Sequence, residues 1–211
     1  MKKPLVVTVA NLKGGTTKTT TAAYVMHGLA ARGYRVLGVD ADPPGSLLRW
    51  AELGAWDLAV VGLPTKALHT RLPAISAGYD AIVVDTPPLD DQAGIVFAAL
   101  RAADVVIVPV SPTTMELDRL SPILDAVDEV SPLRAAPVMV RVLLTRTVSR
   151  ANSTGGARAA ITDAGIEVMA TEIGRREAYA QSFGTVPSLT SGDPYDLAVT
   201  ELLAAMQDGV L

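Results

Sequence analysis

The sequence has 211 residues, of which 49% are hydrophobic, carries a formal net charge of −4 and contains no cysteine. This length suits one domain with a full-sized core, and the missing cysteines exclude disulfides, a cysteine nucleophile and a cysteine-ligated iron–sulfur cluster. The negative charge argues against coating nucleic acid by bulk charge alone, although a local basic face is compatible with it. No uninterrupted apolar run approaches the roughly 18 residues of a membrane span, so we expect a cytoplasmic protein.

Short apolar runs rich in valine and isoleucine predict β-strands along the chain. The first, LVVTVA, follows a basic start in the manner of a signal peptide, but it is short and leads directly into a glycine loop, so we interpret it as a buried strand. The runs lie at residues 5–10, 35–40, 57–62, 80–85, 104–110, 137–145 and 166–173. Continuous apolar runs of this length suit strands that are buried on both faces of a parallel sheet.

Helical patterns separate these runs, at residues 19–32, 65–77, 92–102, 115–130, 153–164 and 175–183, with a last one at 196–206. This alternation predicts an α/β fold, in which a doubly wound, mostly parallel sheet is flanked by helices with right-handed crossovers. No repeat, low-complexity tract or linker divides the chain, so residues 1–211 are predicted to form a single domain.

Three polar loops follow predicted strands directly: NLKGGTTKT at residues 11–19, DADPPG at 40–45 and DTPPLDD at 85–91. Ligands of an open parallel sheet bind at the carboxyl ends of its strands. The three loops therefore predict one shared site.

The first of these loops has the parts of a phosphate cradle. Gly14 and Gly15 permit a tight turn and a close approach of backbone to an anion, and the helix that follows presents free N–H groups. Lys18 can reach terminal phosphates, and the Thr19 hydroxyl can ligate magnesium. The alternative is a Gly-Thr turn before a helix, with Lys13 and Lys18 as ordinary surface lysines.

The loop departs from the pattern G-x-x-x-x-G-K-[ST] at both glycine positions, which Leu12 and Thr17 occupy. Thr17 lies at the beginning of the helix, where a negative φ tolerates a side chain, so we expect its effect to be modest. If the site instead demands a positive φ, a β-branched threonine is strained, and Thr17→Gly is expected to tighten nucleotide binding.

The stretch KGGTTKTTT, residues 13–21, resembles the deviant Walker A loop K-G-G-x-x-K-[ST] of the ParA and MinD ATPases and their nitrogenase iron-protein relatives, which have a P-loop NTPase architecture. This pattern adds a lysine before the two glycines and does not require glycine at position 12. The resemblance extends over nearly the whole chain. It implies that ATP is held through its phosphates by Lys13, Gly14, Gly15, Thr16, Thr17, Lys18, Thr19 and Thr20.

The resemblance also implies roles for three carboxylates, with Mg²⁺ as the cofactor of ATP hydrolysis. Asp42, in the D-x-D-P segment, is expected to polarise the attacking water, and Asp40 to lie close to the magnesium ion and its waters. Asp85 ends a Walker B pattern and is expected to hold the ion through water, whereas Thr19 binds it directly. The alternative for each aspartate is a strand-end residue that caps a turn or supports the structure.

In the resembled family, the lysine at the position of Lys13 reaches across a dimer interface to the ATP of the other subunit. We therefore expect an ATP-dependent homodimer that hydrolyses ATP slowly and works as a switch, with Lys13, Lys18 and Asp42 in catalysis. The resemblance places the late strand ends beside the adenine, with Thr145, Arg146 and Arg175 as candidate contacts. The alternative is that these arginines are simple surface residues.

Several functions within the family are disfavoured by this sequence. The nitrogenase iron protein needs cysteines for its cluster, and membrane cycling of the MinD kind uses a basic amphipathic helix at the C-terminus, whereas no Lys or Arg follows Arg176. Tyrosine autokinases end in a tyrosine cluster, of which the tail has only Tyr195. A short ParA-type ATPase for plasmid or chromosome partition remains, without an added N-terminal DNA-binding domain.

Such a bacterial protein is expected to bind duplex DNA nonspecifically in its ATP state, to associate with the nucleoid and to be stimulated by a centromere-binding, ParB-like partner. The alternative is a relative that positions a non-DNA cargo, such as a protein cluster, a secretion apparatus or a polysaccharide synthase. A metabolic ligase of the same loop class is a third, more distant hypothesis. Candidate DNA contacts are Arg150, Arg158, Arg175 and Arg176. Residues interpreted as structural are His27, His69, Trp50 and Trp56.

Overall fold

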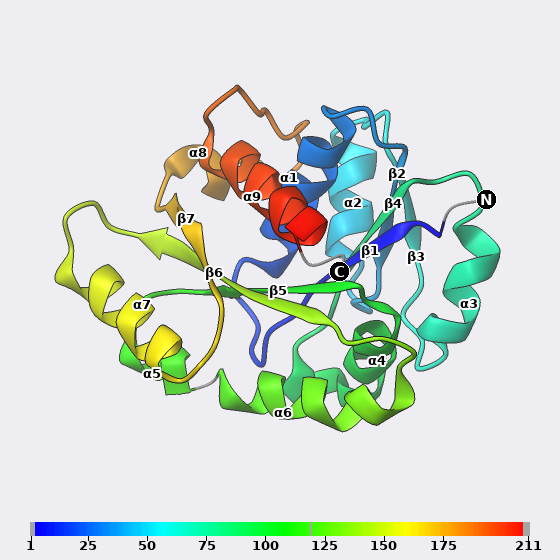
Figure 1. Cartoon of the computed structure of the whole chain (residues 1–211). Coiled ribbons are helices and arrows are strands. Elements are labelled where there is room, and N and C mark those ends of the chain that lie inside the picture. Colours follow the sequence, from blue (N-terminus) through cyan, green and yellow to red (C-terminus); the bar gives the residue numbers. More distant parts are fainter. Residues whose placement is uncertain (1–2, 119, 209–211) are drawn as a thin grey trace.

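A parallel β-sheet runs through the centre of the molecule, with helices on both faces (Figure 1). The computed structural model describes residues 3–118 and 120–208. In these residues seven strands pair in the order β3-β2-β4-β1-β5-β6-β7, and every pair is parallel. The strands are β1 (Leu5–Val9), β2 (Val36–Asp40), β3 (Ala59–Gly62), β4 (Ala81–Asp85), β5 (Val105–Val110), β6 (Met139–Thr147) and β7 (Val168–Gly174). The predicted α/β fold is confirmed.

Two layers of helices explain why the strands read as continuous apolar runs. One face packs against α1 (Lys18–Ala30), α2 (Ser46–Leu53) and α9 (Pro194–Asp208). The other face packs against α3 (Leu68–Ile75), α4 (Leu89–Ala102), α6 (Ser121–Val130) and α7 (Asn152–Asp163). Within β4, Val83 contacts the first layer, whereas Ile82 and Val84 contact the second. Both faces of each central strand are therefore buried, as in other doubly wound folds.

Three helical predictions need correction. Helix α2 was not predicted, although Leu47, Trp50 and Ala51 form the buried stripe of an amphipathic helix. The single helix predicted at 115–130 is wrong, because α5 (Thr114–Asp118) ends before α6 begins, with Pro122 in the first turn of α6. Proline has no N–H to continue a preceding helix but fits a helix start. The helix predicted at 175–183 is only α8 (Glu177–Ala180), and a short 3₁₀ turn (Ser131–Leu133) follows α6.

The strand order brings the other two polar loops, at residues 40–45 and 85–91, next to the phosphate loop. Strand β4 lies between β2 and β1, and Asp85 is the register partner of both Asp40 and Val9. The loops that follow these three strands consequently leave the sheet at adjacent positions. Strands β5, β6 and β7 continue the sheet on the other side of β1 and supply a second set of strand ends.

Candidate functional site

The loop between β1 and α1 turns sharply through two left-handed residues. Gly15 has φ 73°, and Thr17, directly before α1, has φ 65° and ψ 18°. The prediction of a negative φ at Thr17 is therefore wrong. Thr17 is not yet helical, because the chain has to reverse at this last loop position before the helix starts at Lys18. A β-branched residue in this conformation is strained, by about 1–3 kcal/mol.

The Thr17 side chain links the loop to a distant strand. Its hydroxyl donates to the Thr16 carbonyl at 2.5 Å and lies 3.3 Å from the hydroxyl of Thr145 in β6. Thr145 is 1% exposed. The loop is thereby held against the second half of the sheet, 128 residues further along the chain.

The two lysines of the loop are engaged within their own chain. Lys18 is 6% exposed, and its ammonium donates to the Lys13 carbonyl at 2.8 Å. The Thr16 hydroxyl donates to the same carbonyl at 3.2 Å. The Lys13 ammonium forms an ion pair with Asp90. Burial lowers the pKa of Lys18, and the negative charges of Asp85 and Asp42 oppose this shift. Lys18 and these carboxylates are thus close enough to interact electrostatically, as the three-loop prediction requires.

Asp85 is the most perturbed carboxylate of this group. It is fully buried, and neither of its oxygens has a well-formed hydrogen bond among the described residues. Burial raises its pKa to about 8, although the nearby Thr19 hydroxyl opposes the shift. A buried carboxylate without partners is costly unless a cation or ordered water satisfies it.

Asp40 and Asp42 lie beside Asp85 in different environments. Asp40 is 1% exposed, and its two oxygens accept the backbone N–H groups of Asp42 (3.1 Å) and Leu48 (2.9 Å). It therefore ties the DADPPG loop to α2. Asp42 is half-buried, and burial together with the Asp40 charge raises its pKa, while Lys18 opposes this. Asp42 is thus the more accessible carboxylate of this pair.

These residues fit a magnesium–phosphate group. The Asp85 oxygens, which lack a well-formed hydrogen bond in the part of the chain that the structure describes, and the adjacent Thr19 hydroxyl are hard donors of the kind that Mg²⁺ prefers. Among the described residues no three His, Asp, Glu or Cys side chains gather into a metal cluster. This suits an ion that takes few protein ligands and completes its shell with water and phosphate. A bound dication would also offset the cost of burying the Asp85 charge.

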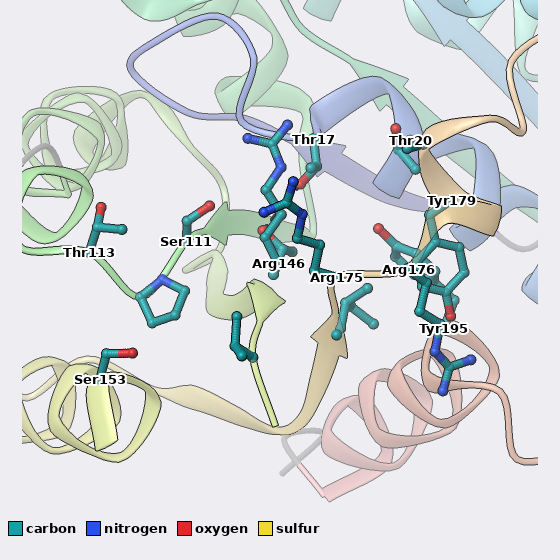
Figure 2. A pocket seen from close by; sticks show the side chains of 16 residues that line it. Thr17, Thr20, Ser111, Thr113, Arg146, Ser153, Arg175, Arg176, Tyr179 and Tyr195 are labelled. Atoms are coloured by element: carbon teal, nitrogen blue, oxygen red, sulfur yellow. Dashed lines mark hydrogen bonds between the residues drawn. The ribbon is translucent and has the colours of Figure 1, made fainter. Parts of the chain in front are cut away.

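A cavity of about 660 Å³ opens beside the phosphate loop (Figure 2). All three candidate adenine contacts, Thr145, Arg146 and Arg175, line it, as do Thr17 and Thr20 of the loop region. Strand β6 is irregular here, because its pairing with β7 shifts at Thr145 and Arg146 has φ 54°. The volume lies in the range of small-molecule sites, and its position next to the loop suits the nucleoside of a bound nucleotide.

Other wall residues of this cavity were not predicted. They are Ser111, Pro112, Thr113, Val148, Ser153, Ile173, Gly174, Arg176, Tyr179, Ala180 and Tyr195. Tyr179 stands edge-on to Tyr24 and Tyr195, with ring centroids 5.1 and 5.2 Å away, and donates to the Asp193 carboxylate at 3.0 Å. The Tyr195 hydroxyl meets that of Thr21 at 3.2 Å. The expected position of the late strand ends beside the adenine is the sequence signal that pointed to this wall, and it singled out only Thr145, Arg146 and Arg175.

Two of the four candidate DNA-contacting arginines form ion pairs within the chain. Arg158 forms an ion pair with Glu172 at 2.8 Å and donates to the Met169 carbonyl at 2.7 Å. Arg176 forms an ion pair with Asp193 at 3.4 Å, and Arg175 lines the cavity beside it. Arg150 is exposed, with φ 63°. A role of these four side chains in DNA binding stays a prediction.

The tryptophan and histidine side chains are packed within the protein, against other residues of the chain. The indole N–H groups of Trp50 and Trp56 both donate to the Thr185 carbonyl, at 2.7 and 2.9 Å. His27 stacks edge-on against Trp56, and burial lowers its pKa to about 4. The His69 Nδ1 atom is buried without a hydrogen-bond partner among the described residues. In the part of the chain that the structure describes, no helix has the length and apolar character needed to cross a membrane.

Comparison with known proteins agrees with this geometry. Residues 7–185 match the family model described as the CobQ/CobB/MinD/ParA nucleotide binding domain. The maintenance of carboxysome distribution protein A of Gloeobacter kilaueensis is 44% identical over 118 residues, which span 54% of this chain but only 52% of that protein. Its namesake from Halothiobacillus neapolitanus is 31% identical over 84% of this chain and 82% of its own length.

A second kind of relative has a different name. The chromosome-partitioning ATPase Soj of Thermus thermophilus is 30% identical over 96% of each chain. Among solved structures, the cobyrinic acid a,c-diamide synthase of Mycobacterium smegmatis with a bound ATP analog and magnesium has a TM-score of 0.80 at 23% identity, covering 98% of this chain and 97% of that one. At this identity the structural likeness shows the shared fold alone.

Proposed function

Because the chain belongs to the CobQ/CobB/MinD/ParA nucleotide-binding family, we propose that it is a magnesium-dependent ATPase whose ATP-bound form dimerises and acts as a slow switch. The observation that carries this proposal is the fully buried Asp85, placed between the Lys18 loop and Asp42 and close to the Thr19 hydroxyl, whose oxygens have no well-formed hydrogen bond among the described residues. Such an arrangement is unfavourable for an empty protein and favourable for one that binds a cation with phosphates.

Each residue has a defined task in this proposal. Lys18 neutralises the terminal phosphates, and the loop N–H groups cradle them. The Thr19 hydroxyl and the Asp85 carboxylate would hold a magnesium ion, which would supply positive charge opposite the phosphates. Asp42 orients the water whose oxygen attacks the terminal phosphorus, giving ADP and phosphate, while Asp40 fixes the loop that carries Asp42.

The cavity beyond the loop is the proposed nucleoside site, with Thr145, Arg146 and Arg175 as its adenine contacts. Lys13 is proposed to reach the ATP of a second copy. The test of this core proposal is equilibrium binding of ATP and ADP with and without Mg²⁺, together with the oligomeric state in each condition. Binding that requires Lys18 and self-association that requires ATP support it; a monomer indifferent to nucleotide refutes it.

Two biological roles are compatible with this cycle. The relatives named for carboxysome distribution favour positioning of a protein cargo, and they include the 31% identical protein that aligns over 84% of this chain. The relative named a chromosome-partitioning ATPase favours DNA segregation with a centromere-binding partner. In both roles, we propose, the ATP-bound dimer uses nonspecific duplex DNA as its support, in the cytoplasm of a bacterium.

One pair of measurements separates these roles. Binding to random-sequence duplex DNA with ATP, ADP or no nucleotide, with Lys18→Ala as control, tests the shared step; such binding is expected to need ATP and to weaken steeply with salt. Deletion of the gene in its host then shows whether the cargo is a replicon or a protein assembly. Loss of a replicon supports partition, whereas clustering of a protein assembly with normal DNA inheritance supports protein positioning.

A further inference from the structure

The first turn of α4 is joined to the phosphate loop residue by residue. The backbone N–H of Leu89 donates to the Asn11 carbonyl at 3.1 Å, and that of Asp90 donates to the Leu12 carbonyl at 3.2 Å. The Asp90 carboxylate then forms the ion pair with the Lys13 ammonium. Leu89 and Asp90 thus contact the three successive loop residues 11–13. The first two contacts are backbone hydrogen bonds, and the third is the ion pair between the side chains of Asp90 and Lys13.

Lys13 is held at both of its ends. Its carbonyl accepts the Lys18 ammonium at 2.8 Å, and its own ammonium lies on Asp90. The side chains of Lys13 and Asp90 are 46% and 36% exposed, so the ion pair is open to water and to an incoming anion. An ion pair of this exposure is weak enough to exchange for a more highly charged partner.

We propose that Asp90 is a positioning residue for Lys13, which retains this lysine on its own chain until a nucleotide triphosphate draws it away. This inference rests on the proposed function, in which Lys13 serves the ATP of a second copy. The triphosphate carries several negative charges against the single charge of Asp90. Lys13 therefore changes partner only when the triphosphate is present, and Asp90 raises the ATP concentration at which copies associate.

Asp91 provides the matched control for Asp90. It lies in the same turn, is exposed and forms no ion pair among the described residues, and its charge acts at longer range on Lys18 and Asp42. Both carboxylates lie in the short turn before Gln92, whose non-helical backbone (φ −141°, ψ 53°) kinks α4, so the loss of either removes one negative charge from the same segment. Only the loss of Asp90, however, frees Lys13.

The first experiment measures Lys13 without nucleotide. The intact chain is treated briefly with an amine-acylating reagent, and modification of Lys13 is quantified by peptide mass spectrometry relative to the exposed Lys66. In Asp90→Asn we expect labelling of Lys13 to rise about two- to fivefold, as the loss of a half-exposed ion pair implies, and to remain unchanged in Asp91→Asn. Equal labelling in the wild type and both variants overturns the inference.

The second experiment measures nucleotide-driven association. Sedimentation with Mg²⁺ and a non-hydrolysable ATP analogue is expected to show that Asp90→Asn associates at an about two- to fivefold lower analogue concentration than wild type or Asp91→Asn. Combining Asp90→Asn with Lys13→Gln is expected to abolish this gain, because the two substitutions then remove the same interaction. Asp90→Glu, which keeps the charge, is expected to behave as wild type.

The outcomes distinguish this inference from the function on which it rests. If the wild type binds the analogue but Asp90→Asn and Asp91→Asn associate alike, the role of Asp90 is refuted and the proposed ATPase stands. If the wild type binds no analogue at all, the proposed function is refuted and the inference with it, whatever the labelling of Lys13.

Discussion

The left-handed backbone of Thr17 leads to a prediction about stability in which two variants are compared. Thr17→Gly removes the side chain and its conformational strain, whereas Thr17→Ala removes the hydroxyl and its contacts with Thr16 and Thr145 but keeps a Cβ at φ 65°. The hydroxyl contacts are lost in both variants. Their difference in unfolding free energy therefore isolates the cost of the backbone conformation.

The two contributions to this difference have opposite signs. An L-residue in the left-handed region costs about 1–2 kcal/mol relative to glycine. Alanine, by contrast, lowers the conformational entropy of the unfolded chain relative to glycine. This effect on the unfolded state alone favours alanine by about 0.4–1 kcal/mol. Thr17→Gly is consequently expected to be more stable than Thr17→Ala by about 1 kcal/mol, or roughly 2–4 °C in Tm for a chain of this size.

Urea unfolding of both variants without nucleotide measures the difference. Gly33 has φ 83° and open space around it, so Gly33→Ala gives the cost of a Cβ at a left-handed position far from the site. If Gly33→Ala is destabilising but Thr17→Ala is as stable as Thr17→Gly, Thr17 does not hold a positive φ in solution. Because the strain exists before nucleotide binds, removing it is expected to raise stability more than ATP affinity.

Three further predictions concern buried groups. Burial raises the pKa of Asp85 to about 8, so the carboxylate destabilises the magnesium-free fold increasingly as the pH rises from about 4 to about 8. Asp85→Asn is therefore expected to be more stable than wild type by on the order of 5 kcal/mol at the upper end of this range and unchanged at the lower end. Lys18→Ala is expected to weaken ATP binding at least about tenfold in titration calorimetry. Trp50→Ala is expected to cost about 3–5 kcal/mol in urea unfolding, because the 2% exposed indole leaves a cavity.

Each of these has a contrary outcome. For Asp85→Asn, a difference from wild type that is independent of pH would show that the carboxylate keeps an ordinary pKa. Unaltered ATP affinity in Lys18→Ala would remove the loop from the phosphate site. A loss of unfolding free energy below about 1 kcal/mol in Trp50→Ala would mean that neighbouring side chains fill the space left by the indole, or that water already occupies it.

The sequence was sufficient for the sheet and for the position of the phosphate loop. Valine-rich runs identify strands that are buried on both faces, and the Lys13–Thr19 spacing identifies a turn between strand and helix. These signals are local in sequence. The convergence of the DADPPG and DTPPLDD loops also followed, because successive strands of a doubly wound sheet end on the same side.

Features that depend on tertiary contacts were not predicted. Tyr24, Tyr179 and Tyr195 form one aromatic cluster although they come from α1, α8 and α9, and no spacing relates them. The sign of φ at Thr17 depends on how the chain enters α1, which residue identity leaves open. The Lys13–Asp90 ion pair likewise exists only because α4 begins against the loop.

The shared acceptor of the two indoles gives the chain a built-in optical probe. Trp50 and Trp56 are the only tryptophans of the sequence, and both donate to the Thr185 carbonyl, in the segment between α8 and α9. Emission from the unlabelled protein therefore reports on one place, the anchorage of this segment to α2. Because α8 borders the cavity and α2 is tied to Asp40, any rearrangement that a nucleotide causes there is expected to change the emission spectrum without an added dye.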